Sequence, residues 1–431
     1  GRPPANRRLT AYGLMEFEDM AKVHDVDPNL IRRTRDWLLA QRKSDGSWEE
    51  APGLHAEADP ARGQRGDLAR YVTTAYIAWA VFNGQSSDSR ARQTLDYLLS
   101  TKPDRIDDPY VLALACNALL ALDPDGKEAK PYLERLEELK KASEDGKQCW
   151  WEMKQGERTC FYGAGQSGSV ETTALATLAL LHAKQSPGTA RAALAWIVAR
   201  KDARGTWQST QATVYALKAL LAGMGKGNEE KERVIELALG DGQKQTVRIP
   251  RDQAEVMKLI DLSRHLKPGQ QLLAVKELSD TAANFQVAFR YHVPGEKPAK
   301  DEPLSVSIDY DRTDLRVGET VTARAAVVNR TNGVAPMVML DLPIPAGFAV
   351  SPDGLANAVS QGQIARYQLT ARQVIVYVRG LQPGAKLELR YTLRATMPVK
   401  VTVPAARAYE YYDPDRQGHG KAVKMTVTAR P

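Results

Sequence analysis

Residues 172–176 read Thr-Thr-Ala-Leu-Ala, and this small, apolar segment has counterparts along the first half of the chain. The counterparts are Leu-Thr-Ala-Tyr at 9–12, Val-Thr-Thr-Ala-Tyr at 72–76, Val-Leu-Ala-Leu-Ala at 111–115 and Thr-Gln-Ala-Thr at 210–213. Apolar residues spaced three and four apart around each segment predict helices that are apolar on nearly every side and therefore buried on both.

Helices with one charged face are expected between these apolar helices. Their predicted ranges are 31–41, 89–99, 131–142 and 189–200. Buried and half-exposed helices that alternate at a repeat of several tens of residues indicate stacked helical hairpins. We predict that the hairpins close into an α/α toroid, with the apolar helices inside.

Two loops that follow outer helices share a sequence pattern. Residues 41–48 read Gln-Arg-Lys-Ser-Asp-Gly-Ser-Trp, and residues 201–207 read Lys-Asp-Ala-Arg-Gly-Thr-Trp. Glycine is suited to the left-handed stop at a helix end, and the tryptophan can fold back onto that end. We therefore expect both loops to be structural.

The pattern changes to strands after about Gly223. Alternation of apolar and polar residues begins near 247–249 and 272–275, and a Pro-rich stretch at 293–298 is typical of a linker. Further strands are predicted at 304–310, 320–328, 337–342, 373–378, 387–395, 399–403 and 424–428, with one helical turn near 355–359. The prediction is a multidomain α + β protein: a toroid at 1–224, a β domain at 225–298 and a β-sandwich at 299–431.

Composition excludes several classes of protein. The chain has 431 residues, of which 43% are hydrophobic and 26% charged, so wholesale disorder is excluded. The longest apolar runs are shorter than the roughly 20 residues that cross a bilayer. The net charge of +7 is scattered rather than concentrated on one face, which argues against nucleic-acid binding. The start at Gly1-Arg2-Pro3-Pro4, without a signal segment, suggests a fragment of a longer protein.

Motifs for enzymatic chemistry are missing from the sequence. It contains no glycine-rich phosphate loop, no His-Glu-x-x-His and no Gly-x-Ser-x-Gly, so we predict neither a cofactor nor a metal. The three cysteines, Cys116, Cys149 and Cys160, are too few for a four-thiolate zinc site, and a Cys149–Cys160 disulfide stays open. His55 is the candidate site residue: it lies in a polar loop at one end of the predicted toroid, where an imidazole can act as base or nucleophile. A solvated loop histidine is the plainer interpretation.

Several segments resemble the C-terminal part of the alpha-2-macroglobulin and complement family. Residues 205–213, Gly-Thr-Trp-Gln-Ser-Thr-Gln-Ala-Thr, are similar to a segment of the family's toroidal thioester domain. Residues 340–348 resemble the strand that ends in Pro-x-Gly-Phe, 374–377 a core strand, and 408–415 the family's tyrosine-rich ending. The resemblance implies a thioester-domain toroid, the second half of a CUB domain and a receptor-binding-type macroglobulin sandwich.

The function implied by the resemblance is protease trapping. In the family, a protease cuts a bait region and a buried Cys–Gln thioester then acylates the target, once and without catalytic turnover. The implied partners are target proteases or surface proteins, together with the N-terminal macroglobulin, CUB and thioester segments. Residues 50–55 resemble the complement stretch whose histidine attacks the thioester, which implies that role for His55.

The sequence departs from the family in two places. The thioester motif Gly-Cys-Gly-Glu-Gln does not occur, so this chain alone cannot form the covalent bond. The two lysines that animal members present to an endocytic receptor fall near Pro352 and Ala356, which favours a bacterial member in the periplasm or secreted.

Two other interpretations compete with the covalent trap. One is a thioester-less family member that acts as a binding scaffold or steric trap. The other is a terpene cyclase, an α/α barrel with similar Gly-x-Trp loops, although the clustered aspartates which such an enzyme needs are missing.

Overall fold

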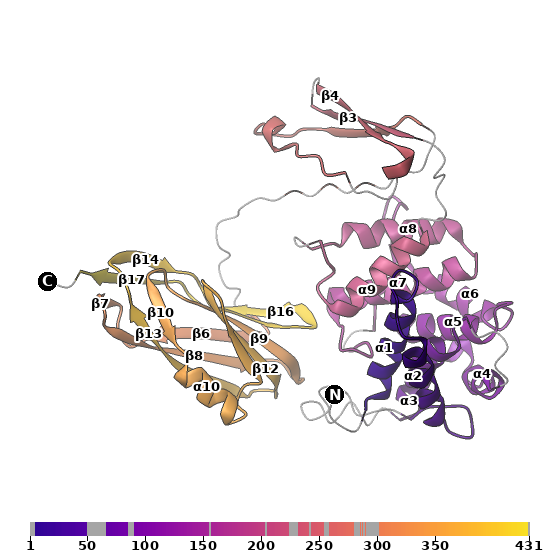
Figure 1. Ribbon diagram of the computed structural model, residues 1–431, viewed down its shortest axis with the longest axis horizontal. Helices are drawn as coiled ribbons and strands as arrows, with labels where there is room; N and C mark the ends of the chain where they lie inside the picture. Colours follow the sequence, from indigo (N-terminus) through magenta and orange to yellow (C-terminus); the bar gives the residue numbers. More distant parts are fainter. Residues whose placement is uncertain are drawn as a thin grey trace. The chain divides into compact units, whose positions relative to one another are not determined.

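The computed structural model describes residues 5–49, 66–84, 90–154, 157–202, 205–223, 232–240, 243–253, 258–279, 285, 287, 289 and 301–429. The chain divides into two compact units: residues 1–219 together with 292–431, and residues 220–291 (Figure 1). Among the described helices, none is long and apolar enough to cross a membrane.

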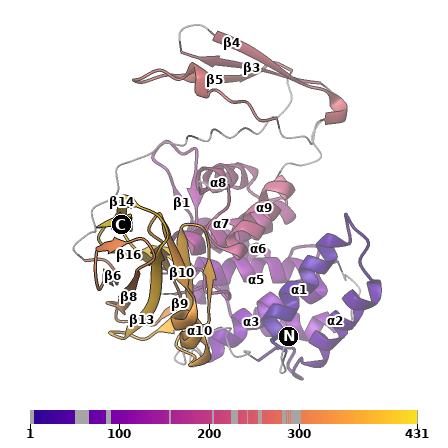
Figure 2. The ribbon, with the colours of Figure 1, turned by 60° about the vertical axis from the view of Figure 1, so that its left-hand side comes forward.

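Helices make up the N-terminal part of the first unit. They are α1 (Arg7–Met20), α2 (Pro28–Ala40), α3 (Gly66–Phe82), α4 (Ala91–Leu99), α5 (Pro109–Leu122), α6 (Lys130–Glu138), α7 (Gly165–His182), α8 (Pro187–Ala199) and α9 (Thr210–Gly223). Every residue of α5 except Leu120 is buried, and α5 packs between α3 and α7 (Figure 2). In contrast, α4 and α6 each bury one face only. This alternation confirms the helical part of the predicted fold class, the toroid.

Polar caps fix where several of these helices begin. The Asp108 side chain accepts a hydrogen bond from the Tyr110 amide at 2.9 Å, and Pro109 occupies the first turn of α5. Asn6 caps α1 in the same way through the Leu9 amide. Such caps satisfy amide groups that would otherwise have no partner at a helix start.

Three tryptophans tie an outer helix to the next inner helix in the same way. The indole Nε1 atoms of Trp48, Trp151 and Trp207 donate to the carbonyl oxygens of Leu38, Leu136 and Ile197, at 2.7, 2.7 and 2.6 Å. The backbone amides of the same tryptophans donate to threonine hydroxyls, of Thr74, Thr173 and Thr213, at 3.0, 3.1 and 3.1 Å. We call these three arrangements the tryptophan staples. The sequence predicted the first and the last of them, and the staple at Trp151 was missed.

The second unit contains a small antiparallel sheet. Its strands are β3 (Arg233–Leu239), β4 (Gln243–Ile249) and β5 (Leu273–Glu277), in the order β4-β3-β5. Cross-strand pairs place Leu237 beside Val275 and Leu239 beside Leu273, so one face of the sheet is apolar. These side chains are only half-buried.

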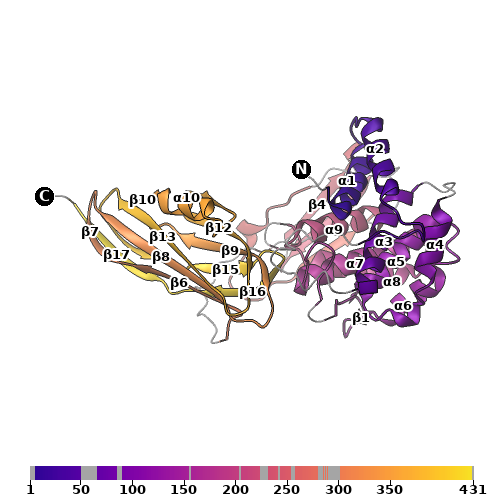
Figure 3. The same ribbon diagram turned by 90° about the horizontal axis from the view of Figure 1, so that it is seen from below.

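The C-terminal part of the first unit is a β-sandwich. One sheet has the order β10-β13-β8-β6 and the other β11-β12-β9-β15-β16, with a small third sheet β14-β17-β7 (Figure 3). The strands are β6 (Leu304–Tyr310), β7 (Asp314–Arg316), β8 (Thr320–Asn329), β9 (Ala335–Pro343), β10 (Phe348–Ser351), β11 (Arg366–Leu369), β12 (Gln373–Leu381), β13 (Lys386–Ala395), β14 (Val399–Val403), β15 (Arg407–Glu410), β16 (Asp413–His419) and β17 (Val423–Thr428). Burial of every second residue in β8 and β12 builds the core between the sheets. The expected helical turn is α10 (Asp353–Ser360).

Replacing Trp151 with alanine should destabilise the helical part by about 3–5 kcal/mol, since a fully buried indole and its hydrogen bond to the Leu136 carbonyl are lost. Urea unfolding followed by helical circular dichroism measures the change. Trp150→Ala is the matched control, because the Trp150 indole is half-exposed, stacks on Trp196 and donates its hydrogen bond to the exposed Glu152 side chain rather than to a helix end. Equal losses in the two variants would contradict the staple.

Residues 299–431 should fold when expressed alone, because the buried side chains of the sandwich core all lie between Leu304 and Val427. We expect a cooperative thermal transition by near-ultraviolet circular dichroism. A gradual, non-cooperative melt would show that the sandwich depends on the helices for its stability.

Candidate functional site

The site predicted at His55 lies outside the described residues, which resume at residue 66. Its role therefore stays a prediction. The described residues do bring together another group of side chains that the sequence did not indicate. We call it the junction: residues 158–167, which lead into α7, together with residues 410–416, where β15 turns into β16.

A buried carboxylate forms the centre of the junction. Glu410 has no exposed surface, and its Oε2 accepts a hydrogen bond from Arg158 Nη2 at 2.7 Å. Arg416 Nε lies 3.0 Å from the other carboxylate oxygen. Burial raises the pKa of Glu410, and the two guanidinium groups oppose that rise without cancelling it. A charge buried to this degree requires such partners.

The main chain of Tyr412 completes the contact. Its carbonyl oxygen accepts hydrogen bonds from Ser167 Oγ at 2.6 Å and from the Ala164 amide at 3.3 Å. Its ring lies 5.8 Å from that of Tyr162, and Tyr411 packs edge-on against it at 5.0 Å. The turn after β15 is thus bound to the start of α7 through backbone and side chains alike.

Asp413 lies against the first residue of α7. Gly165 has a φ of 53°, and a Cβ added there would lie 2.4 Å from Asp413 Oδ1, so only glycine fits. Burial raises the pKa of Asp413, while Arg158 acts in the opposite direction. The amide groups at the start of an 18-residue helix carry partial positive charge, which favours a carboxylate in this position.

The loop before α7 has a strained backbone. Tyr162 has a φ of 70°, a conformation that costs a non-glycine residue about 1–3 kcal/mol. Thr159 closes the loop: its Oγ1 accepts from the Gly163 amide at 2.9 Å, and its carbonyl accepts from the Tyr162 amide at 3.0 Å. Tyr110 Oη accepts from the Cys160 amide at 3.0 Å and fixes the loop to α5.

Aromatic side chains fill the helical core behind this loop. Phe161 contacts Tyr76 with ring centroids 5.4 Å apart and Tyr12 with centroids 5.9 Å apart. Tyr215 Oη donates to Tyr76 Oη at 3.0 Å, and burial raises the pKa of both phenols far above the usual range. The phenols therefore stay protonated, and this core excludes water rather than titrating.

The cysteines do not form a reactive centre. All three are buried thiols without disulfides, so the open question of a Cys149–Cys160 bridge is answered by two free thiols. Burial raises the pKa of Cys149 to about 11 and that of Cys116 further, which makes both poor nucleophiles at neutral pH. Within the described residues, no group of three or more histidine, cysteine or carboxylate side chains could hold a metal ion.

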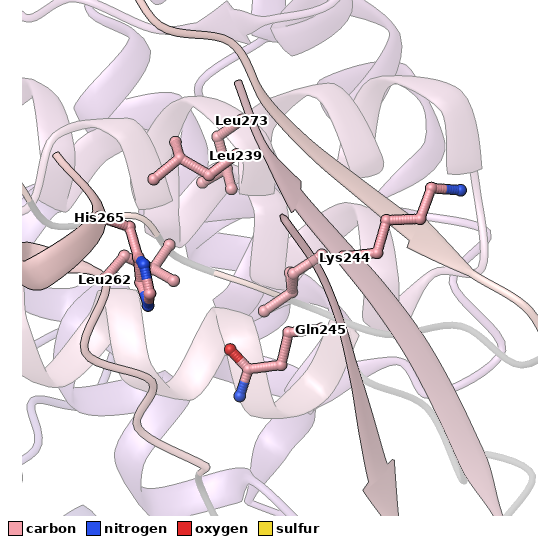
Figure 4. A pocket seen from close by; sticks show the side chains of 7 residues that line it. Leu239, Lys244, Gln245, Leu262, His265 and Leu273 are labelled. Atoms are coloured by element: carbon pink, nitrogen blue, oxygen red, sulfur yellow. The ribbon is translucent and has the colours of Figure 1, made fainter. Parts of the chain in front are cut away.

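A pocket of about 390 Å³ opens on the small sheet of the second unit. It is lined by four leucines and three polar residues: Leu237, Leu239, Leu262, Leu273, Lys244, Gln245 and His265 (Figure 4). The lining is mostly leucine on a half-exposed sheet, which is typical of a surface that another segment covers.

Comparisons with known proteins match both the helical part and the β-sandwich. The family model of the A-macroglobulin TED domain matches residues 1–222, and that of the A-macroglobulin receptor binding domain matches residues 333–421. The chain is 23% identical to ovostatin of Gallus gallus over 427 residues, which is 95% of the chain and 28% of ovostatin. It is 26% identical to complement C3 of Lethenteron camtschaticum over 226 residues, 50% of the chain and 13% of C3.

Solved structures share the fold. Escherichia coli alpha-2-macroglobulin, from domain MG7 to the C-terminus, has a TM-score of 0.62 at 16% identity, covering 99% of this chain and 63% of that one. Salmonella alpha-2-macroglobulin reacted with methylamine has a TM-score of 0.61 at 16% identity, covering 98% and 26%. With more than half of its residues matched by the TED-domain model, the chain belongs to the alpha-2-macroglobulin and complement family.

Proposed function

We propose that this chain is the C-terminal part of a protease trap that captures its target by acyl transfer from a thioester. The chain spans 28% of ovostatin, so the bait region and the Cys–Gln thioester would lie on segments outside it. Such a trap acts once and has no catalytic turnover. Its partners would be proteases or surface proteins, and its location the periplasm or the extracellular space.

The junction is the observation that carries this proposal. A thioester survives only where water is excluded, and it reacts when that protection is removed. Phe161 and Tyr162 are buried beside the turn that contains Tyr412. A protected acyl bond requires a cover that excludes water and can later be removed. A sandwich domain that packs against the aromatic end of a toroid would be such a cover.

Residues 225–298 would form the second half of a CUB domain. The apolar face of β3 and β5 is half-buried, and Leu272 beside it is 77% exposed. Strands from a segment that precedes the toroid would cover this face. The exposed leucines support the proposal, because an uncovered apolar sheet face favours association.

Methylamine tests covalent capture in the longer protein that contains the upstream segments. If a thioester is present, methylamine should be incorporated once and one cysteine thiol released, as measured by intact mass and thiol titration. Protein with no methylamine incorporated would support the thioester-less scaffold instead. The matched control is the same protein with its motif cysteine replaced by alanine.

The proposed role of His55 predicts a change in acceptor preference. If the imidazole attacks the thioester, His55→Ala should shift acylation from hydroxyl toward amine acceptors, measured by competition between glycerol and methylamine. His24→Ala is the matched control, because His24 is an exposed histidine. An unchanged acceptor ratio would remove His55 from the mechanism while leaving the thioester intact.

The proposed CUB pairing predicts that the apolar face of the small sheet is covered and that its amides are protected from hydrogen exchange. Supplying the upstream segment in trans should slow hydrogen exchange of the β3 and β5 amides, and Leu237→Lys should abolish the slowing. Thr246→Lys, on the opposite face of β4, should not interfere. Equal exchange with and without the segment would contradict the pairing.

A further inference from the structure

We propose that Arg158, Glu410 and Arg416 form a latch which holds the loop at residues 158–164 in its strained conformation and releases it when the sandwich departs. As a regulator of covalent capture, the latch rests on the proposed function. As a contact between the helical part and the sandwich of the first unit, the latch is supported by the geometry of the junction alone.

The first step of the argument is the double role of one guanidinium group. Arg158 Nη2 donates to Glu410 Oε2 at 2.7 Å, and Arg158 Nη1 donates to the Tyr162 carbonyl oxygen at 3.4 Å. The same side chain therefore contacts the sandwich carboxylate and the residue whose backbone is strained. Only arginine offers separate donors in a fixed plane for two such acceptors.

The second step concerns the other end of the loop. The Ala164 amide donates to the Tyr412 carbonyl, two residues beyond Glu410. The loop is thus bound at both ends by residues of one short turn, 410–412. If that turn withdraws, the loop loses both contacts together. The Arg158 side chain, which donates to the carbonyl of the left-handed Tyr162, then loses the carboxylate that orients it.

The third step is the burial of the charges. Glu410 is completely buried, and the Arg158 side chain is 11% exposed. A buried ion pair contributes orientation more than net stability, whereas removing one partner leaves a charge without compensation. Arg416, which is 30% exposed, is the only one of the three that can turn toward water on its own. The latch should therefore be either fully formed or open.

Cys160 provides a reporter inside the loop. Its thiol is buried and free, two residues from Arg158, so it should react with a maleimide only when the loop opens. Cys116, in the middle of α5, has no exposed surface and reports unfolding of the helices. Modification of each cysteine is followed separately by peptide mass spectrometry.

The test measures the rate of Cys160 modification in the whole chain. Glu410→Gln and Arg158→Met should each raise that rate by about tenfold or more, and the double variant should add little beyond either single one, because both remove the same contact. Arg158→Lys, which keeps the charge but cannot serve both acceptors, should have an intermediate effect. Glu388→Gln is the matched control, since Glu388 forms an exposed pair with Lys386 on the same sandwich.

Two results would overturn the latch. One is an unchanged Cys160 rate in Glu410→Gln and Arg158→Met. The other is a rise in Cys116 modification parallel to that of Cys160, which would mean that the helices unfold as a whole. The assay needs no thioester, so a negative methylamine result in the longer protein would refute covalent capture and leave the latch standing.

Discussion

The fold depends on helices that are apolar on every side. A helix such as α5, with all but one residue buried, is stable only when other helices cover it completely. This requirement produces the inner and outer layers of the toroid. The tryptophan staples then fix three outer helices, α2, α6 and α8, to the next inner one, since an indole that donates to a helix-end carbonyl satisfies two buried groups at once.

Local sequence patterns predicted most of this architecture. The period of apolar residues indicated the alternation of helices, and turn residues at regular spacing, such as Gly318 and Gly333 on either side of 320–328, indicated the strands of the sandwich. The staple at Trp151 escaped because three more residues separate glycine from tryptophan there than in the other two loops. The extra residues contain strand β2 (Cys149–Trp150), which pairs with β1 (Lys141–Ala142) in a short hairpin, and this insertion hides the shared pattern.

The junction could not be predicted from such patterns. Arg158 and Glu410 are 252 residues apart, and no spacing rule connects a loop in the helices with a strand end in the sandwich. Strand β16 reads Asp-Pro-Asp-Arg-Gln-Gly-His, which is too polar to indicate a strand. A glutamate between tyrosines gives no sign of complete burial. His55, the residue that the family resemblance singled out, lies outside the described residues and keeps its predicted role only as a proposal.

Residue 165, the first residue of α7, is a glycine that lies directly against the sandwich turn. The carboxylate of Asp413 fills the space where a Cβ would be, so the start of α7 and the sandwich turn must have compatible shapes at this single atom. A methyl group there would displace the Asp413 carboxylate and strain the backbone at φ 53°, yet it would touch neither hydrophobic core. A single missing carbon atom therefore bears on how closely the two folded parts meet, while the interior of each part does not depend on it.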